Sequence, residues 1–174
     1  MGTTVRLEDY LDRDDLPEDV REAIRAEVCA RESLEREFAR EHRRLEAILR
    51  DMPVMLDAYD ESGAIVFWNN ECERVTGYGA AVIVGNPDAS ELLYPDDAYR
   101  QKVYADWEAR GEDVHGRTTR VTCRDGSVKT IAWSNVSRSA PVPGWRDWAI
   151  GIDVTDLERG TQLLETQRDL GVAL

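Results

Sequence analysis

Apolar and polar positions divide the chain into three parts, and the first, residues 1–50, has the pattern of a long helix. Its apolar residues recur at spacings of three and four. Three acids stand four positions before an arginine, which is the stabilising order in a helix, so we expect the ion pairs Glu27–Arg31, Glu32–Arg36 and Glu46–Arg50. The stripe consists of Ile24, Val28, Phe38, Leu45 and Leu49. Because a long helix with so thin a stripe is rarely stable alone, we expect a coiled-coil-like dimerisation segment; packing on its own domain also fits the pattern.

The second part, residues 51–156, alternates short apolar segments with turn residues, as a globular domain does. Strands are expected over residues 54–59, 65–69, 114–123, 127–137 and 145–154. Short helices are expected over residues 71–75, ended by Gly77, and from Asp96 or Asp97 to about Arg110. Two strands, short helices and then three strands predict an α+β fold, a five-stranded antiparallel sheet with short helices on one face, flanked by N-terminal and C-terminal helices.

The third part, residues 157–174, has the pattern of a second helix with two possible apolar stripes. The sequence stops at Leu174 without a cap or a helix breaker. We therefore expect a truncated C-terminal helix that continues into another module of a longer protein.

Composition narrows the classes of partner. The formal net charge of −13 disfavours nucleic acid, because binding to phosphates requires a basic surface, and it disfavours an anionic membrane for the same reason. No apolar segment reaches the length that spans a bilayer, so we expect no membrane insertion. Cys29, Cys72 and Cys123 are odd in number and lack CxxC spacing, which predicts reduced thiols, no metal site and a cytoplasmic protein.

Several short motifs, taken in order and spacing, make residues 47–159 similar to a PAS domain. They are Asp60-Glu61-Ser62-Gly63-Ala64-Ile65-Val66, Trp68-Asn69, Thr76-Gly77-Tyr78, Gly85, Tyr94-Pro95-Asp96-Asp97, Arg124-Asp125-Gly126-Ser127 and Asp153-Val154-Thr155. The resemblance implies a sensing and dimerisation module of a bacterial or archaeal signalling protein, such as a sensor histidine kinase in a two-component system.

The resemblance also implies roles for individual residues. Asn69 links the second strand to the helix that follows it, and Asp153 and Thr155 lie where the sheet ends and the output helix begins. Residues 157–174 are then the C-terminal signalling helix. We expect Asp153 to accept N–H bonds at the start of that helix and to pair with Arg159, which makes these three residues candidates for signal relay.

The chain itself lacks the motifs of a catalyst, so we expect it to be no enzyme. His42 has neither the acidic neighbour nor the downstream proline of a phospho-acceptor box, and no glycine-rich nucleotide loop is present.

The sequence does not identify a cofactor. The flavin photoreceptors of the family carry a reactive cysteine where Gly85 to Ala89 stand here, and this cysteine is absent. The haem-binding members carry a histidine on the long central helix, and residues 94–110 contain none. Redox-sensing flavin members carry a tryptophan that Trp107 matches, but His115 stands where they have a second one. The favoured expectation is no cofactor, with flavin as an alternative and haem disfavoured.

Aromatic residues supply the candidates for a ligand pocket. The five tryptophans are explained most simply as core packing, and alternatively as the lining of a pocket for a planar or apolar ligand. The pocket candidates are Trp68, Asn69, Trp107, Trp133, Asn135 and Trp148. We expect a homodimeric sensory module that relays a small-molecule or partner signal to a downstream output domain; a flavin redox sensor and a ligand-free interaction scaffold are the alternatives.

Overall fold

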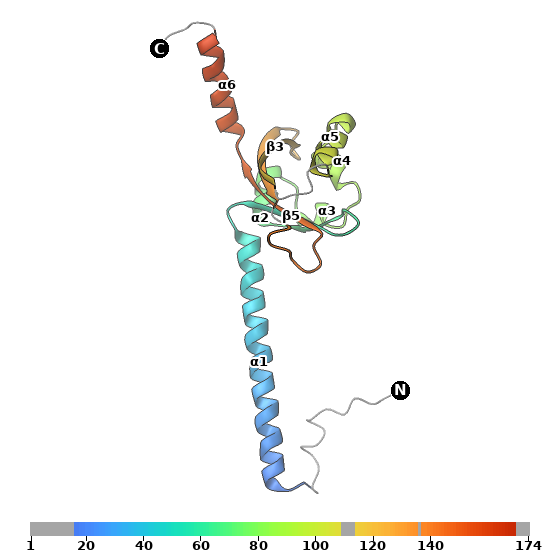
Figure 1. Ribbon diagram of the computed structural model, residues 1–174, viewed down its shortest axis with the longest axis vertical. Helices are drawn as coiled ribbons and strands as arrows, with labels where there is room; N and C mark the ends of the chain where they lie inside the picture. Colours follow the sequence, from blue (N-terminus) through green and yellow to red (C-terminus); the bar gives the residue numbers. More distant parts are fainter. Residues whose placement is uncertain (1–15, 109–113, 136, 170–174) are drawn as a thin grey trace. The chain divides into compact units, whose positions relative to one another are not determined.

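The computed structural model describes residues 16–108, 114–135 and 137–169 (Figure 1). The chain forms two compact units, Met1–Ile48 and Leu49–Leu174. The ends of the predicted dimerisation segment and signalling helix, residues 1–15 and 170–174, lie outside the described residues. Within the described ranges, no helix combines the length and the apolar character needed to cross a membrane.

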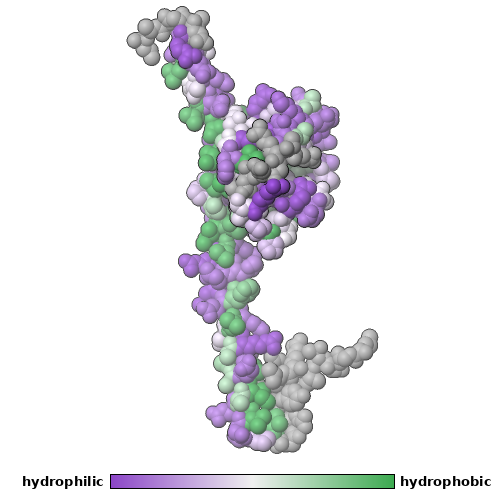
Figure 2. Space-filling view, viewed as in Figure 1, coloured by the Kyte–Doolittle hydropathy of each residue, from purple (hydrophilic) through white to green (hydrophobic). Residues whose placement is uncertain are grey.

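Helix α1 (Glu18–Asp51) confirms the helix predicted for the first part of the chain. None of its described side chains is buried, and apolar and polar residues alternate along it (Figure 2). The expected ion pair Glu32–Arg36 forms, with 2.6 Å between Oε2 and Nη2. Arg31, expected to pair with Glu27, instead contacts Glu35 at 3.0 Å. The exposed apolar residues of the helix are Val20, Leu34, Phe38, Leu45 and Ile48.

The second unit contains the predicted five-stranded antiparallel sheet, with strand order β2-β1-β5-β4-β3. The strands are β1 (Met55–Tyr59), β2 (Ile65–Trp68), β3 (Val114–Thr122), β4 (Val128–Asn135) and β5 (Asp147–Asp153). The helices are α2 (Asn70–Thr76), α3 (Ala80–Ile83), α4 (Ala89–Leu93), α5 (Asp97–Glu108) and α6 (Thr155–Asp169). The short helices α2 to α5 follow β2 and precede β3 (Figure 1), and the α+β prediction is confirmed.

Turn residues end the elements where the sequence predicts. Gly77 has a φ of 74°, in the left-handed region that favours glycine, and its N–H donates to Glu73 O at 2.8 Å, which ends α2. Asp125 Oδ1 accepts the N–H of Ser127 at 2.9 Å in the turn between β3 and β4. The bond between Asp125 and Ser127 sets the register of the long β3–β4 hairpin.

The core lies between the sheet and the short helices, on what we call the inner face of the sheet. Residues of all five strands meet residues of α2, α3 and α4 there. The buried apolar cluster is Met55, Ile65, Trp68, Cys72, Val75, Ile83, Ala89, Leu93, Val121, Ile131, Trp133 and Ala149. Trp133 covers Gly151, its partner on β5, so closely that the glycine has no room for a side chain.

This close approach gives a first prediction. A Cβ on Gly151 would lie 2.7 Å from two ring carbons of Trp133 and 2.9 Å from Ile131 Cγ2, so Gly151→Ala should lower the free energy of unfolding by about 1–3 kcal/mol. Gly160→Ala is the control, because a Cβ there meets nothing within 4 Å and α6 gains a better helix former. Urea unfolding measures both; equal stabilities for the two variants would contradict the packing described.

Candidate functional site

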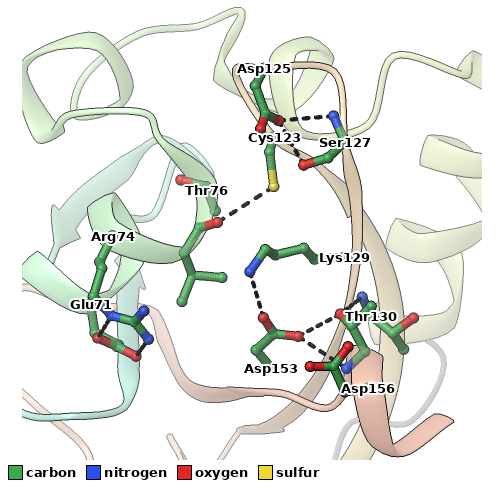
Figure 3. A network of polar contacts seen from close by, with 12 residues as sticks. Glu71, Arg74, Thr76, Cys123, Asp125, Ser127, Lys129, Thr130, Asp153 and Asp156 are labelled. Atoms are coloured by element: carbon green, nitrogen blue, oxygen red, sulfur yellow. Dashed lines mark hydrogen bonds and ion pairs between the residues drawn. The ribbon is translucent and has the colours of Figure 1, made fainter. Parts of the chain in front are cut away.

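The passage from the sheet to helix α6 is a compact polar junction (Figure 3). Strand β5 ends at Asp153 and α6 begins at Thr155, so Val154 alone separates them. Asp153 Oδ1 accepts the backbone N–H of Thr155 at 3.0 Å and also accepts its hydroxyl. The carboxylate thereby satisfies a donor at the start of the helix, where negative charge is favourable.

Strand β4 holds this junction from the side. Lys129 Nζ donates to Asp153 Oδ2 at 2.7 Å, and the N–H of Thr130 donates to Thr155 Oγ1 at 2.9 Å. The N–H of Val154 donates to the carbonyl of Thr130 at 2.9 Å. Two consecutive residues of β4 therefore fix both the last residue of the sheet and the first residue of the helix.

The charges at the junction stabilise one another. Partial burial by itself would raise the pKa of Asp153, but the bonds from Lys129 and Thr155 outweigh it and hold that pKa below its ordinary value. The bond to the Asp153 carboxylate raises the pKa of Lys129. Both groups are therefore ionised at neutral pH, and the pair is a charge-assisted hydrogen bond.

Helix α2 anchors the other end of this assembly. The N–H of Arg124, in the β3–β4 turn, donates to Thr76 O at 2.8 Å. Cys123 Sγ lies 3.5 Å from Val75 O, and Figure 3 shows this contact. Glu71 and Arg74 form a two-bond ion pair on the same helix, at 2.7 and 2.5 Å. Contacts therefore run from α2 through the hairpin and β4 to the start of α6.

Two of the three predicted relay residues, Asp153 and Thr155, lie together where the sheet ends and helix α6 begins. Asp153 accepts an N–H there, as expected. The expected pairing of Asp153 with Arg159 is wrong: Arg159 lies 3.9 Å from Asp156, and Lys129 takes the Asp153 carboxylate instead. The reason is geometric, because the carboxylate turns back toward β4 while Arg159 projects from the second turn of α6.

Lys129 is the residue that sequence reasoning missed at this junction. The strand register places Ile131 opposite Asp153, so Lys129, two positions earlier, lies on the same face of the sheet and in diagonal reach of the carboxylate. A register counted from the Asp125-Gly126 turn would have found it.

Asn69 is completely buried and uses its side chain to hold backbone together. Its Oδ1 accepts the N–H groups of Leu56 and Cys72, each at 3.0 Å, and its Nδ2 donates to Val54 O at 2.8 Å. Asn69 is the N-cap of α2 and joins that helix to β1, the first strand, whereas the resemblance implies a link from the second strand to the helix.

The tryptophans among the pocket candidates are not gathered at one place. Trp68 and Trp133 are buried, and their indole N–H groups donate to Tyr78 O at 3.0 Å and to Thr119 Oγ1 at 2.9 Å. Trp148 pairs with Ala58 on β1, three positions from Gly151, and so lies on the opposite face of the sheet from Trp133. Trp68 and Trp133 are therefore part of the packed core, and Trp148 lies outside any pocket on the inner face.

The two remaining candidates, Trp107 and Asn135, lie nearer the inner face. Trp107 packs against the core, and the guanidinium of Arg117 lies 5.2 Å from the centre of its ring. Asn135 pairs with Ala149 of β5, and its Oδ1 accepts from the N–H and hydroxyl of Ser137 at 2.9 and 2.6 Å.

A shallow hollow of about 150 Å³ lies beside the outer strand β3. Tyr94, Tyr99 and Arg120 contribute to its wall, and Tyr99 Oη accepts the backbone N–H of Arg120 at 2.8 Å. None of the six pocket candidates lines this hollow.

The inner face also carries a buried carboxylate that sequence reasoning missed. Asp57, in β1, is 4% exposed; its Oδ2 accepts the hydroxyl of Tyr59 at 3.0 Å, and its Oδ1 has no hydrogen-bond partner among the described residues. Burial raises the pKa of Asp57 to about 7, although the bond from Tyr59 and the nearby backbone N–H groups of Asp57 and Ala149 oppose this. The residue stands within an apolar segment in which both faces of the strand are buried, so an alternating pattern could not reveal it.

Comparisons with known proteins agree with this architecture. The family model of the PAS fold matches residues 43–141. The structure is similar to the PAS domain of an HTR-like protein from Haloarcula marismortui, with 23% identity and a TM-score of 0.56, over 70% of this chain and 98% of that one. It is similar to a PAS domain from Colwellia psychrerythraea, with 19% identity and a TM-score of 0.51, over 66% of this chain and 97% of that one.

A further similar structure is an RNA-binding light-oxygen-voltage receptor, with 24% identity and a TM-score of 0.56. The alignment covers 73% of this chain and 37% of the receptor, so the chain spans little more than a third of that protein. The search of curated proteins gives no match.

The fold and the junction define a sensory domain with an exit helix. The chain belongs to the PAS family, because the family model matches more than half of its length. It is a signalling sensor module of that family.

The buried carboxylate leads to a prediction about pH. The pKa of Asp57 is 3.8 in an unfolded chain and about 7 in the folded protein, which therefore retains the proton over that interval. As far as this group is concerned, the free energy of unfolding should be highest below pH 3.8 and should fall as pH rises to 7, by up to about 4 kcal/mol.

Urea unfolding at a series of pH values checks this slope. Asp57→Asn should remove it, while Asp88→Asn should retain it, because Asp88 is exposed and its side chain makes no capping bond. Identical pH profiles for the wild type and Asp57→Asn would contradict the burial described.

Proposed function

We propose that this chain is the sensory and dimerisation module of a cytoplasmic signalling protein, such as a sensor histidine kinase, and that it acts without catalysis of its own. In this proposal, a small molecule or a partner protein shifts the sheet, and the shift passes through the junction to helix α6 and a downstream output domain. The single observation that carries the proposal is the attachment of both sides of the junction to β4. Free thiols at Cys72 and Cys123 fit a reducing compartment.

The geometry makes the helix respond to the sheet. Because one residue connects β5 to α6 and several hydrogen bonds hold that connection, a sliding of β4 against β5 has to break these bonds or carry the first turn of α6 with it. A packed sheet of this kind changes between discrete arrangements rather than by continuous deformation, which suits a switch.

A ligand-free interaction scaffold is the second candidate. The observation that favours it is the internal bonding of Trp68 and Trp133, whose N–H groups need no ligand. In a scaffold, partner binding rather than a ligand would shift the sheet, and the same junction would carry the change.

Replacement of Asp153 tests the relay. Asp153→Asn removes the charge that Lys129 and the start of α6 share, so it should lower domain stability by about 1–2 kcal/mol and increase hydrogen exchange of the first α6 amides. Asp156→Asn is the matched control, because its fully exposed carboxylate lies 3.9 Å from an exposed arginine, and we expect no measurable change. Exchange of the first turn of α6 that is equal in the two variants would overturn the coupling.

Dimerisation is proposed to use an apolar stripe of α1 that differs from the expected one. It keeps Ile24, Phe38 and Leu45 but has Val20, Leu34 and Ile48 in place of the half-buried Val28 and Leu49, and all its apolar members except the half-buried Ile24 are exposed. Val20, Ile24, Leu34, Phe38, Leu45 and Ile48 follow alternating steps of three and four when Glu27, Arg31 and Glu41 are counted as polar members of the series. Such a repeat is the seam of a two-stranded coil, and polar members set its register.

Phe38→Glu should therefore shift the monomer–dimer equilibrium toward monomer by at least tenfold, because Phe38 is 74% exposed in the single chain and would be buried in the seam. Arg40→Glu, on the opposite side of the helix, should leave the equilibrium within about twofold. Sedimentation equilibrium over a range of concentrations measures both. A monomeric wild-type chain, or equal effects of the two variants, would refute this dimer.

A further inference from the structure

The carboxylate of Asp57 lacks the partner that a buried charge requires. Its side chain is almost fully buried, Oδ2 accepts from one hydroxyl, and Oδ1 accepts from no group in the described part of the chain. Buried carboxylates in proteins are normally paired with a cation or fully hydrogen-bonded, because an unpaired one loses its hydration without compensation. An oxygen left in this state marks a position where a donor is missing.

The described groups around Asp57 do not supply a positive charge. The side chains that interact with it electrostatically are Tyr59, Tyr94, Tyr104 and Cys72, all neutral or acidic. Lys129 of the junction is paired with Asp153, and Arg117 is paired with Asp106. The carboxylate of Asp57 therefore has no cationic partner among the described residues.

The neighbours of Asp57 suit an organic cation. On the inner face, the strand register places Ala149 of β5 beside Asp57, and Asn135 of β4 beside Ala149. The methyl group of Ala149 therefore lies between the carboxylate of Asp57 and the amide of Asn135. The partly buried rings of Tyr59, Tyr94 and Trp107 pack against the same core. Aromatic faces around a carboxylate are the surroundings in which proteins recognise ammonium groups.

We propose that Asp57 is the recognition group of an internal site for a small organic ammonium ion, an amine that carries an apolar or aromatic body. The inference rests on the proposed sensory function, of which it names the ligand class. An ammonium group supplies both the missing positive charge and an N–H donor for Oδ1, while its apolar body lies against the tyrosine and tryptophan rings.

Neither a proton nor a water molecule supplies both the positive charge and the hydrogen-bond donor that Asp57 lacks. A proton neutralises the carboxylate, and on Oδ2 it can be donated to the Tyr59 hydroxyl, but it leaves Oδ1 without a donor. A water molecule donates to Oδ1 but leaves the charge unpaired. An ammonium ion satisfies the charge and the hydrogen bond together.

The test is a titration of the full 174-residue chain at pH 8 with benzylammonium, methylammonium, benzyl alcohol and benzoate, followed by calorimetry and by thermal unfolding. We expect benzylammonium to bind and to raise the unfolding temperature, and benzyl alcohol and benzoate to bind at least tenfold more weakly. Asp57→Asn should weaken benzylammonium binding by at least tenfold, whereas Asp88→Asn, which changes an exposed carboxylate, should leave it within about twofold.

Circular dichroism should show that Asp57→Asn is folded at pH 8, because the substitution removes an unpaired buried charge. Equal affinity for benzyl alcohol, unchanged binding by Asp57→Asn, or absence of binding by both amines would each overturn the ammonium site. Such a failure is distinguishable from failure of the sensory proposal, since the α6 exchange of the Asp153→Asn variant is measured without any ligand.

Discussion

The second unit depends on the buried side chain of Asn69. One amide group bonds the backbone before β1, the backbone within β1 and the first turn of α2, and it does so with no exposure to solvent. An amide is suited to this position because it offers donors and an acceptor at once, whereas a carboxylate could only accept. Since α2 is fixed against β1 in this way, the helix becomes a rigid support for what packs on it.

The β3–β4 hairpin is the element that uses this support. Its turn is bonded to the C-terminal end of α2 through Thr76 and Val75, and β4 leaves that turn to reach Lys129 and Thr130. The position of the first turn of the exit helix is therefore determined at a distance by Asn69, through one helix and one strand. Stability and the proposed signalling share this path, because the contacts that fold the domain are also the contacts that locate the start of α6.

The sequence was sufficient for the strands and turns, because these follow from local chemistry. The Asp125-Gly126 turn and the glycine after α2 fix element ends within a few residues, and Asn69 was recognised through its motif. Lys129 was missed because its partner is 24 positions away. Trp148 belongs to the face of β5 that carries the large apolar residues, whereas the inner face of that strand carries the small Ala149 and Gly151, so side-chain size alone does not identify the inner side. Asp57 was missed because both faces of β1 are buried, which removes the alternation that reveals a strand's inner side.

The unpaired carboxylate and the exit junction are joined by a single strand. Asp57 pairs with Ala149, and four residues further along β5 the chain reaches Asp153. An occupant of the inner face changes the output only if it binds one arrangement of the sheet more tightly than another, and a buried unpaired charge supplies such a difference. The arrangement that brings a donor to Asp57 gains a pairing that the other lacks, and β5 is the shortest path by which that preference reaches the first turn of α6.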